Sequence, residues 1–255
     1  MRFVLHALGS IDSTQTEVHR LASQGAPEGT VVTARHQRAG RGQRGHEWWD
    51  DPGESLLASV LLRPSSSPGA APQLSLVAGL AVADALATAG ATARIRWPND
   101  LLVDDRKVCG ILAEASSGSP TSRGAGTGEL HHVILGMGMN LNQTRFPAAL
   151  ADRATSLRLI TGRVCDRDAM LTTLLTQLDR RYATWQTGGF AALRTAWLAH
   201  SLLPGQIVRL PDGTLGAGED LRDDGVLLAR AVDGRLVPVV SSGAVEEVTA
   251  HAAGH

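Results

Sequence analysis

The stretch that decides the fold, residues 40–48, reads GRGQRGHEW and combines three glycines, two arginines and a tryptophan. It fits the pattern G-x-G-x-x-G, in which the last glycine opens a helix and an acidic residue follows about 20 positions later to bind a ribose. Here Gly45 is followed by HEWWDDPG, which does not start a helix, and position 65 lies in a run of serine and proline. A dinucleotide-binding fold is therefore excluded. The lack of Gly-Lys-Ser/Thr also excludes a Walker loop.

Two interpretations of residues 40–48 remain. A glycine-rich connection is most often a solvated hairpin loop. A connecting loop, however, has no need to expose Trp48 and Trp49 beside Arg41 and Arg44. Backbone N–H groups freed by glycines, with guanidinium groups beside them, suit a small anion. We therefore expect a flexible loop that closes over an anionic ligand and excludes water.

Composition restricts the class of protein. The 255 residues are 43% hydrophobic and 19% charged, with a formal net charge of −1, so no global field favours nucleic acid or an anionic membrane. The two cysteines, Cys109 and Cys165, show no metal or disulfide spacing, which favours a reducing compartment. The first residues are too short and too polar for a signal peptide, and no apolar run approaches the ~20 residues of a membrane span. We expect a cytoplasmic protein.

Hydrophobic periodicity indicates a mixed α+β domain, with helices covering strand pairs, followed by a small β domain. Helical spacing predicts helices at 13–24, 74–89, 168–186 and 190–200. Strand-like segments lie at 31–34, 55–62, 94–97, 107–114 and 132–137, with loops at 64–72 and 116–128. After residue 203, short strands at 206–210, 214–216, 226–229 and 236–240 are separated by Asp-Gly turns, which is typical of a small barrel. We place the domains at 1–203 and 204–255.

Two further clusters carry unusual chemistry. Residues 96–100 read RWPND and lead into 107–114, KVCGILAE, where Lys107 begins an apolar strand and Gly110 permits close approach of a ligand. A lone lysine after a turn is more often simply solvated. Residues 136–142 read GMGMNLN, so Asn140 and Asn142 lie on one face of a strand end. Such a pair suits an adenine edge or a metal shell, although turn capping is the simpler alternative.

The ordered set GRGQRGHEW, RWPND, KVCGILAE and GMGMNLN resembles the motifs of the biotin protein ligases. The likeness covers most of the chain, since residues 11–14 and 154–157 are similar to the family's Ser-Thr and Thr-Ser-Leu elements and the C-terminal barrel to its SH3-like domain. It implies a class II synthetase-like, biotin/lipoate ligase-type mixed sheet flanked by helices. The Ser-Thr element begins at position 13, so we expect the monofunctional form, without an N-terminal DNA-binding domain.

The resemblance also implies an activity. Biotin and ATP would form biotinyl-5′-AMP and pyrophosphate, with Mg²⁺ as activator, and a lysine of a biotin carboxyl carrier domain would then release AMP. The acceptor domain would belong to acetyl-CoA carboxylase or a related carboxylase. No direct DNA binding and no membrane association are expected, and a homodimer is left open.

The motifs carry the expected site residues. The catalytic group would be Lys107, Arg41 and Asp100, with Asp100 either orienting Lys107 or helping to deprotonate the incoming lysine. Biotin would be bound by Ser13, Thr14, Gln37, Gly40, Arg41, Gly42, Trp48, Lys107 and Gly110. ATP would be bound by Arg41, Arg44, Trp48, Trp97, Asn99, Lys107, Asn140 and Asn142, with Asn140 also serving the metal.

The sequence departs from the family pattern at three positions. Gln43 stands where the family has its second loop arginine, which puts that side chain's part in retaining the intermediate in doubt unless Arg44 substitutes for it. Arg96 stands before Trp97, where the family motif has lysine, which is a mild change, and Gln15 replaces the commoner asparagine after Ser-Thr. None of these changes removes an obligatory chemical group.

Two other classes of function compete with this interpretation. A lipoate ligase or octanoyltransferase is the nearest enzymatic alternative, and the transferases need a nucleophilic cysteine near a lysine. Cys109 lies two residues past Lys107, but within an apolar strand that favours a core position. A biotin-binding module without catalysis is the alternative from another class, and the presence of Lys107 with both asparagines argues against it.

Replacing Cys109 with Ala is expected to leave most of the ligase activity intact, because a cysteine that only fills the core forms no bond to the substrate. The measurement is the rate of biotin transfer to a carboxyl carrier domain. Abolition of transfer would instead favour thioester chemistry.

Overall fold

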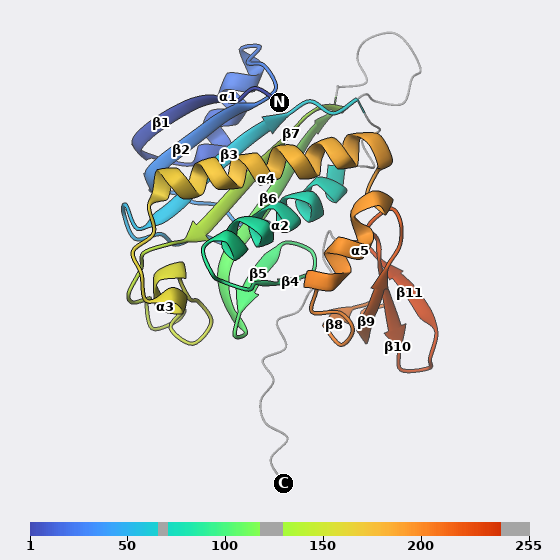
Figure 1. The fold of residues 1–255 in the computed structure, drawn as a ribbon. Coiled ribbons are helices and arrows are strands. Elements are labelled where there is room, and N and C mark those ends of the chain that lie inside the picture. The colour runs from blue at the N-terminus through green and yellow to red at the C-terminus, as the bar shows by residue number, and fades with distance from the viewer. Residues whose placement is uncertain (66–70, 118–129, 241–255) are drawn as a thin grey trace.

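The computed structural model describes residues 1–65, 71–117 and 130–240. Its main feature is a seven-stranded mixed sheet in the order β1-β2-β3-β7-β6-β5-β4 (Figure 1). The strands are β1 (Val4–Ile11), β2 (Thr30–Gln37), β3 (Ser55–Leu62), β4 (Arg94–Arg96), β5 (Asp100–Val103), β6 (Arg106–Ser117) and β7 (Leu130–Asn140). β1 and β2 are parallel and the other neighbouring pairs are antiparallel.

Helices lie on both faces of this sheet. α2 (Ala71–Thr88) and α4 (Arg167–Gly188) cross one face (Figure 1), where Leu56 and Val60 of β3 and Leu135 of β7 join the main hydrophobic core. α1 (Thr14–Ser23) packs on the opposite face, with Val18 of the helix against Ile134 of β7. Because side chains alternate along a strand, the same strands supply a core to one face and a site to the other.

α2 is apolar around most of its circumference. Among the described residues it is the one helix long and apolar enough to cross a membrane by length and composition, and 72% of it is buried. Leu74, Val77, Leu80 and Leu86 have no solvent exposure. Burying each such side chain contributes about 1.5–3 kcal/mol, so the apolar character of α2 is explained by its place in the core.

A second, smaller sheet follows α5 (Ala191–His200). It contains β8 (Ile207–Arg209), β9 (Leu215–Leu221), β10 (Leu227–Ala231) and β11 (Leu236–Val239) in the antiparallel order β11-β10-β9-β8. The turns between these strands place Gly213, Gly225 and Gly234 at φ of 86°, 81° and 87°, which only glycine adopts readily. The four strands are compatible with an SH3-like domain.

The α+β architecture expected from the sequence is confirmed, with three elements added: β1, β5 and α3 (Leu157–Thr161). β1 has little burial contrast along its length because it is a mostly exposed edge strand, and β5 and α3 are too short to show a period. The predicted loop at 64–72 ends earlier, because α2 begins at Ala71, and residues 66–70 and 118–129 lie outside the described part. The boundary near residue 203 stays a prediction.

Candidate active site

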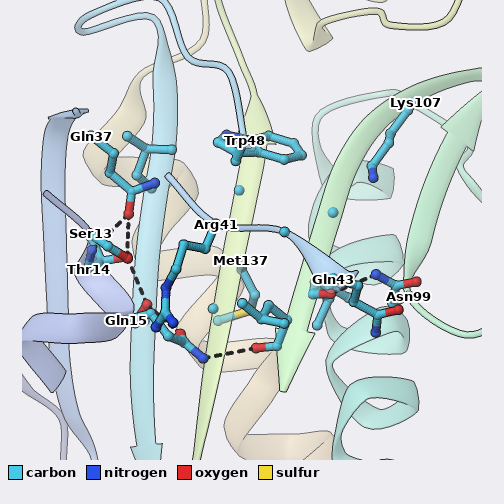
Figure 2. A pocket seen from close by; sticks show the side chains of 18 residues that line it. Ser13, Thr14, Gln15, Gln37, Arg41, Gln43, Trp48, Asn99, Lys107 and Met137 are labelled. Atoms are coloured by element: carbon cyan, nitrogen blue, oxygen red, sulfur yellow. Dashed lines mark hydrogen bonds between the residues drawn. The ribbon is translucent and has the colours of Figure 1, made fainter. Parts of the chain in front are cut away.

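One end of the site is a buried hydrogen-bond network at the start of α1 (Figure 2). Gln37 Oε1 accepts hydrogen bonds from the backbone N–H of Thr14 at 2.8 Å and from its hydroxyl at 3.0 Å. The Thr14 hydroxyl also lies 2.8 Å from Ser59 Oγ, which donates to Gln15 Oε1 at 3.0 Å. Ser13 is the N-cap residue, yet its hydroxyl makes no capping bond. This end can offer both donors and acceptors to a small polar ring.

A β-bulge at the start of β6 sets the direction of Lys107. Leu101 pairs with Cys109 while Leu102 pairs with Lys107, so Val108 is the extra residue, and both Val108 and Cys109 enter the core. In a regular strand, positions 107 and 110 would face opposite sides of the sheet. The bulge restores them to one side. Lys107 and Gly110 therefore line the same pocket.

Lys107 is the only lysine in the sequence, and its charge is paired. Its Nζ lies 2.6 Å from Asp100 Oδ1, and Asp100 Oδ2 accepts from Arg96 at 2.8 Å. Burial alone would raise the pKa of Asp100, but the charges of Lys107 and Arg96 outweigh it and hold the pKa below its usual value. Asp100 is thus a carboxylate between two cations at neutral pH.

Residues 40–48 form an ordered turn over the sheet. The Gly42 N–H donates to His46 O at 2.7 Å and the Trp48 N–H to Gly40 O at 2.9 Å, around a short 3₁₀ turn at Gln43–Gly45. A Cβ on Gly40 would come within 2.6 Å of the Trp48 carbonyl oxygen, so this crossing needs glycine.

The indole of Trp48 lies on a floor of two glycines. A Cβ at Gly138 would be 2.5 Å from the indole and one at Gly110 would be 2.8 Å from it. Lys107 Nζ lies 5.6 Å from the centre of the ring. The Trp48 N–H is buried without a hydrogen-bond partner. Trp48, a residue of the loop, therefore packs on the strand glycines and also lies close to the ammonium group of Lys107.

Arg41 reaches from the loop to β6. Its guanidinium lies 3.1 Å from Glu114 Oε2, and His19 Nε2 lies 3.1 Å from the same oxygen. Arg41 is 45% exposed, so this pair contributes little stability. Glu114 thus gives Arg41 an anionic partner beside the pocket that Arg41 lines.

These side chains enclose a pocket with an empty volume of about 470 Å³, including space open to solvent. Most of the expected site residues line it (Figure 2): Ser13, Thr14, Gln37, Arg41, Gly42, Trp48, Asn99, Lys107 and Gly110. Gly40 does not line the pocket but supports Trp48. Asp100 acts through its ion pair with Lys107. The placement of the Arg44 side chain lies outside what the structure describes.

Three expected nucleotide ligands are placed elsewhere. Trp97 is buried in the core, and its backbone N–H and C=O both bond to the Gln206 side chain, at 2.9 and 2.6 Å. Asn140 is buried and donates to the carbonyl oxygens of Thr155 at 3.0 Å and Lys107 at 3.4 Å. Asn142 exchanges two hydrogen bonds with the backbone of Cys165. Both asparagines thus bond to backbone groups that are distant in sequence, which differs from the local turn capping considered as the simpler alternative.

The metal expected at Asn140 does not fit the residues present. The Asn140 amide oxygen accepts from Gln143 Nε2 at 3.3 Å instead of facing the pocket. Within the described ranges, no group of three or more His, Cys, Asp or Glu side chains could hold a metal ion. The metal role of Asn140 stays a prediction.

The structure adds pocket-lining residues that the sequence analysis did not list for the site: Gln15 and Gln43, noted there only as departures from the family pattern, and Ser59, Gly136, Met137 and Gly138. Gln15 fills the space above Gly136, where a Cβ would be 2.6 Å from its Oε1. A polar Ser59 inside the apolar run SLLASVLL and alternate glycines in a strand were available signals. They gain meaning only when β3 and β7 are known to be neighbours.

Cys109 has no solvent exposure, and burial strongly raises the pKa of its thiol. A thiol in this environment stays protonated and is a poor nucleophile. The core position predicted for Cys109 is confirmed.

The fold and the site together define a class of protein. Residues 8–140 match the model of the Biotin/lipoate A/B protein ligase family, and the chain belongs to this family. It is 39% identical over 239 residues to the Biotin--[acetyl-CoA-carboxylase] ligase of Paracoccus denitrificans, covering 90% of this chain and 95% of that protein.

Further relatives agree. The Bifunctional ligase/repressor BirA of Bacillus subtilis is 36% identical over 230 residues, which cover 88% of this chain and 68% of that protein. The biotin protein ligase from Aquifex aeolicus in complex with biotin and ATP has a similar structure, with a TM-score of 0.77 and 29% identity over 94% of this chain and 97% of that one. The resemblance in the motifs is thereby confirmed.

Replacing Gly138 with Ala is expected to displace the Trp48 indole, because the added methyl would overlap it. Overpacking of this kind costs about 1–3 kcal/mol, so ligand binding should weaken roughly 10-fold. Titration calorimetry with biotin measures it. Gly9→Ala is the matched control, since a Cβ there meets nothing within 4 Å, and equal affinities for both variants would contradict the glycine-floor interpretation.

Replacing Asp100 with Asn is expected to lower the free energy of unfolding by roughly 1–3 kcal/mol at neutral pH, because two cations lose their partner. Since the folded-state pKa of Asp100 is lowered, its stabilisation is present above the unfolded value of about 3.9 and is lost as the pH falls through the folded value. Urea unfolding of both proteins from pH 7 to pH 3 should show the difference shrinking in acid. A difference that does not change with pH would exclude the ion pair as its cause.

Proposed function

We propose that this protein is a biotin–protein ligase, which joins biotin to a lysine of a carboxyl carrier domain at the expense of ATP. The observation that carries the proposal is that the Lys107 ammonium, 5.6 Å from the centre of the Trp48 ring, lines one pocket with Ser13 and the Thr14–Gln37 hydrogen bonds. Two anionic reactants must be brought together, which requires a fixed cation and preorganised donors.

In the first step, the polar end of the pocket would hold the ureido ring. The Ser13 and Thr14 hydroxyls and the Gln37 amide can match its N–H groups and its carbonyl, each of which needs a partner once buried. The biotin carboxylate would then extend toward Lys107. A carboxylate oxygen attacks the α-phosphorus of ATP, the bond to the β-phosphate oxygen breaks, and pyrophosphate leaves. Lys107 and Arg41 lower the repulsion between carboxylate and phosphate.

In the second step, the neutral amine of the acceptor lysine attacks the carbonyl carbon of biotinyl-5′-AMP. The new C–N bond forms, the C–O bond to phosphate breaks, and AMP leaves with the electron pair while the nitrogen loses a proton. Trp48 would cover the intermediate and keep water from it. Lys107 again stabilises the phosphate that leaves.

The nucleotide would lie beside Trp48 and Asn99, which line the Lys107 end of the pocket. Asn140 fixes the strand that carries Lys107, because it bonds to the carbonyl oxygens of Lys107 and Thr155. Mg²⁺ enters the proposal only as a companion of the triphosphate, and no step is assigned to it.

We extend the proposal to partner and organisation. The acceptor is a biotin carboxyl carrier domain of acetyl-CoA carboxylase or a related carboxylase, and the enzyme works in the cytoplasm. Residues 1–203 form the catalytic domain and residues 204–255 the SH3-like domain. DNA binding and membrane association form no part of the proposed function.

The lipoate or octanoate alternative is not favoured. A transferase of that type needs an accessible thiolate, whereas Cys109 is buried and protonated. The Paracoccus relative and the Aquifex structure, which cover 90% and 94% of this chain, carry biotin in their names.

Replacing Lys107 with Ala is expected to reduce biotin-dependent pyrophosphate release by roughly 10²–10³-fold, because one preorganised charge is lost from the transition state. The assay mixes protein, biotin and ATP, and intact-mass analysis of a carrier domain reports transfer. A matched control is Arg38→Ala, which removes an exposed cation from the same loop region, paired with Asp12. No pyrophosphate release by the wild-type protein would disprove the proposed function.

A further inference from the structure

The reactive product of the first step creates a hazard for the enzyme. On the proposed function, the pocket holds a mixed anhydride that acylates amines, and Lys107 Nζ lies in that pocket. An amine held beside an electrophile reacts far faster than one in solution, since effective molarities reach roughly 10⁵ M or more. The nearest lysine to biotinyl-5′-AMP is therefore the enzyme's own.

Protonation of Lys107 blocks this reaction. An ammonium nitrogen has no free electron pair, so it cannot attack the carbonyl carbon. The Asp100 carboxylate lies 2.6 Å from Nζ and, as the opposite charge, pairs with the ammonium form of Lys107.

We infer that Asp100 protects Lys107 from acylation by the intermediate that Lys107 helps to form. Asp100 acts through Lys107 and is a positioning residue. Its two carboxylate oxygens are each engaged by a cation, Oδ1 by Lys107 and Oδ2 by Arg96. A carboxylate held in this way, with a lowered pKa, is a poor base, which argues against the other role considered for it, deprotonation of the incoming lysine.

The reaction that Asp100 prevents is fully defined. The neutral Nζ of Lys107 would attack the carbonyl carbon, forming an amide. The C–O bond to the phosphate would break, AMP would leave with the electron pair, and the nitrogen would release a proton to solvent. The product is an enzyme with one biotinyl group and without its catalytic charge.

The composition of the chain makes this testable by mass. The sequence contains one lysine, so the only other primary amine is that of Met1, which is paired with Asp179 at 2.6 Å. A single biotinyl increment on the intact chain can then be assigned to Lys107 or Met1 by peptide mapping.

The experiment adds synthetic biotinyl-5′-AMP to the full chain, so that it does not depend on adenylation. Asp100→Asn is expected to gain one biotinyl group on Lys107 at least about 10-fold faster than the wild-type protein. Arg96→Met is the matched control, because it removes a partner of the same carboxylate but leaves the carboxylate beside Lys107. It should stay unmodified, as should the conservative Asp100→Glu. Asp100→Ser gives a second reading if Asp100→Asn does not fold.

Three results would overturn the inference: Asp100→Asn that binds the adenylate yet reacts no faster than wild type, an increment confined to Met1, or an increment that persists in Asp100→Asn/Lys107→Arg. The proposed function is tested separately, by pyrophosphate release from the wild-type protein with biotin and ATP. Failure of that assay together with rapid acylation of Asp100→Asn would disprove the function, while still showing that Asp100 limits the acylation of Lys107 by an added adenylate.

Discussion

The site depends on the ion pair between Asp100 and Lys107, and that pair depends on one extra residue in a strand. β5 and β6 shift register by a single position at Val108, which turns Lys107 away from the core and toward the pocket. Without the bulge, the ammonium would point at the apolar face under α2, where burying a charge is very costly. The same shift places Asp100 opposite Gly110, so the carboxylate lies beside the position where the missing side chain leaves room for Trp48 and Lys107.

Space in the pocket exists because glycines in β6 and β7 have no side chains. Gly110 and Gly138 leave room for the Trp48 indole, and Gly136 leaves room for Gln15. These contacts connect the loop, α1 and two central strands, although the residues are far apart in sequence. The loop is therefore held by the sheet beneath it as well as by its own hydrogen bonds, such as the bond from Gly42 to His46. An aromatic side chain held over the pocket floor suits a reaction that must exclude water between its steps.

The sequence predicted a site residue well where the residue type alone indicates its role. It predicted poorly where the role depends on which other segments pack against the residue. Lys107, Arg41 and Trp48 stand in motifs whose residue types state their chemistry, and the structure places all three at one pocket. Asn140 and Trp97 stand in the other two motifs, GMGMNLN and RWPND, and turn inward. Asn140 fastens the backbone beside Lys107, and Trp97 fills the core and is fixed by Gln206, 109 positions away. A motif does not show which of its side chains face the ligand and which support those that do.

The sequence by itself determined the features that short segments encode: the helices and most of the strands, the Asp-Gly turns, the single lysine and the order of the motifs. These follow from periodicity and residue chemistry within short windows. Tertiary structure alone decided which face each motif residue presents, because one bulged residue reverses the alternation of a strand and no local pattern marks it. It also decided that Asp100 forms ion pairs with both Arg96 and Lys107, because the pair with Lys107 requires β5 and β6 to align in one register.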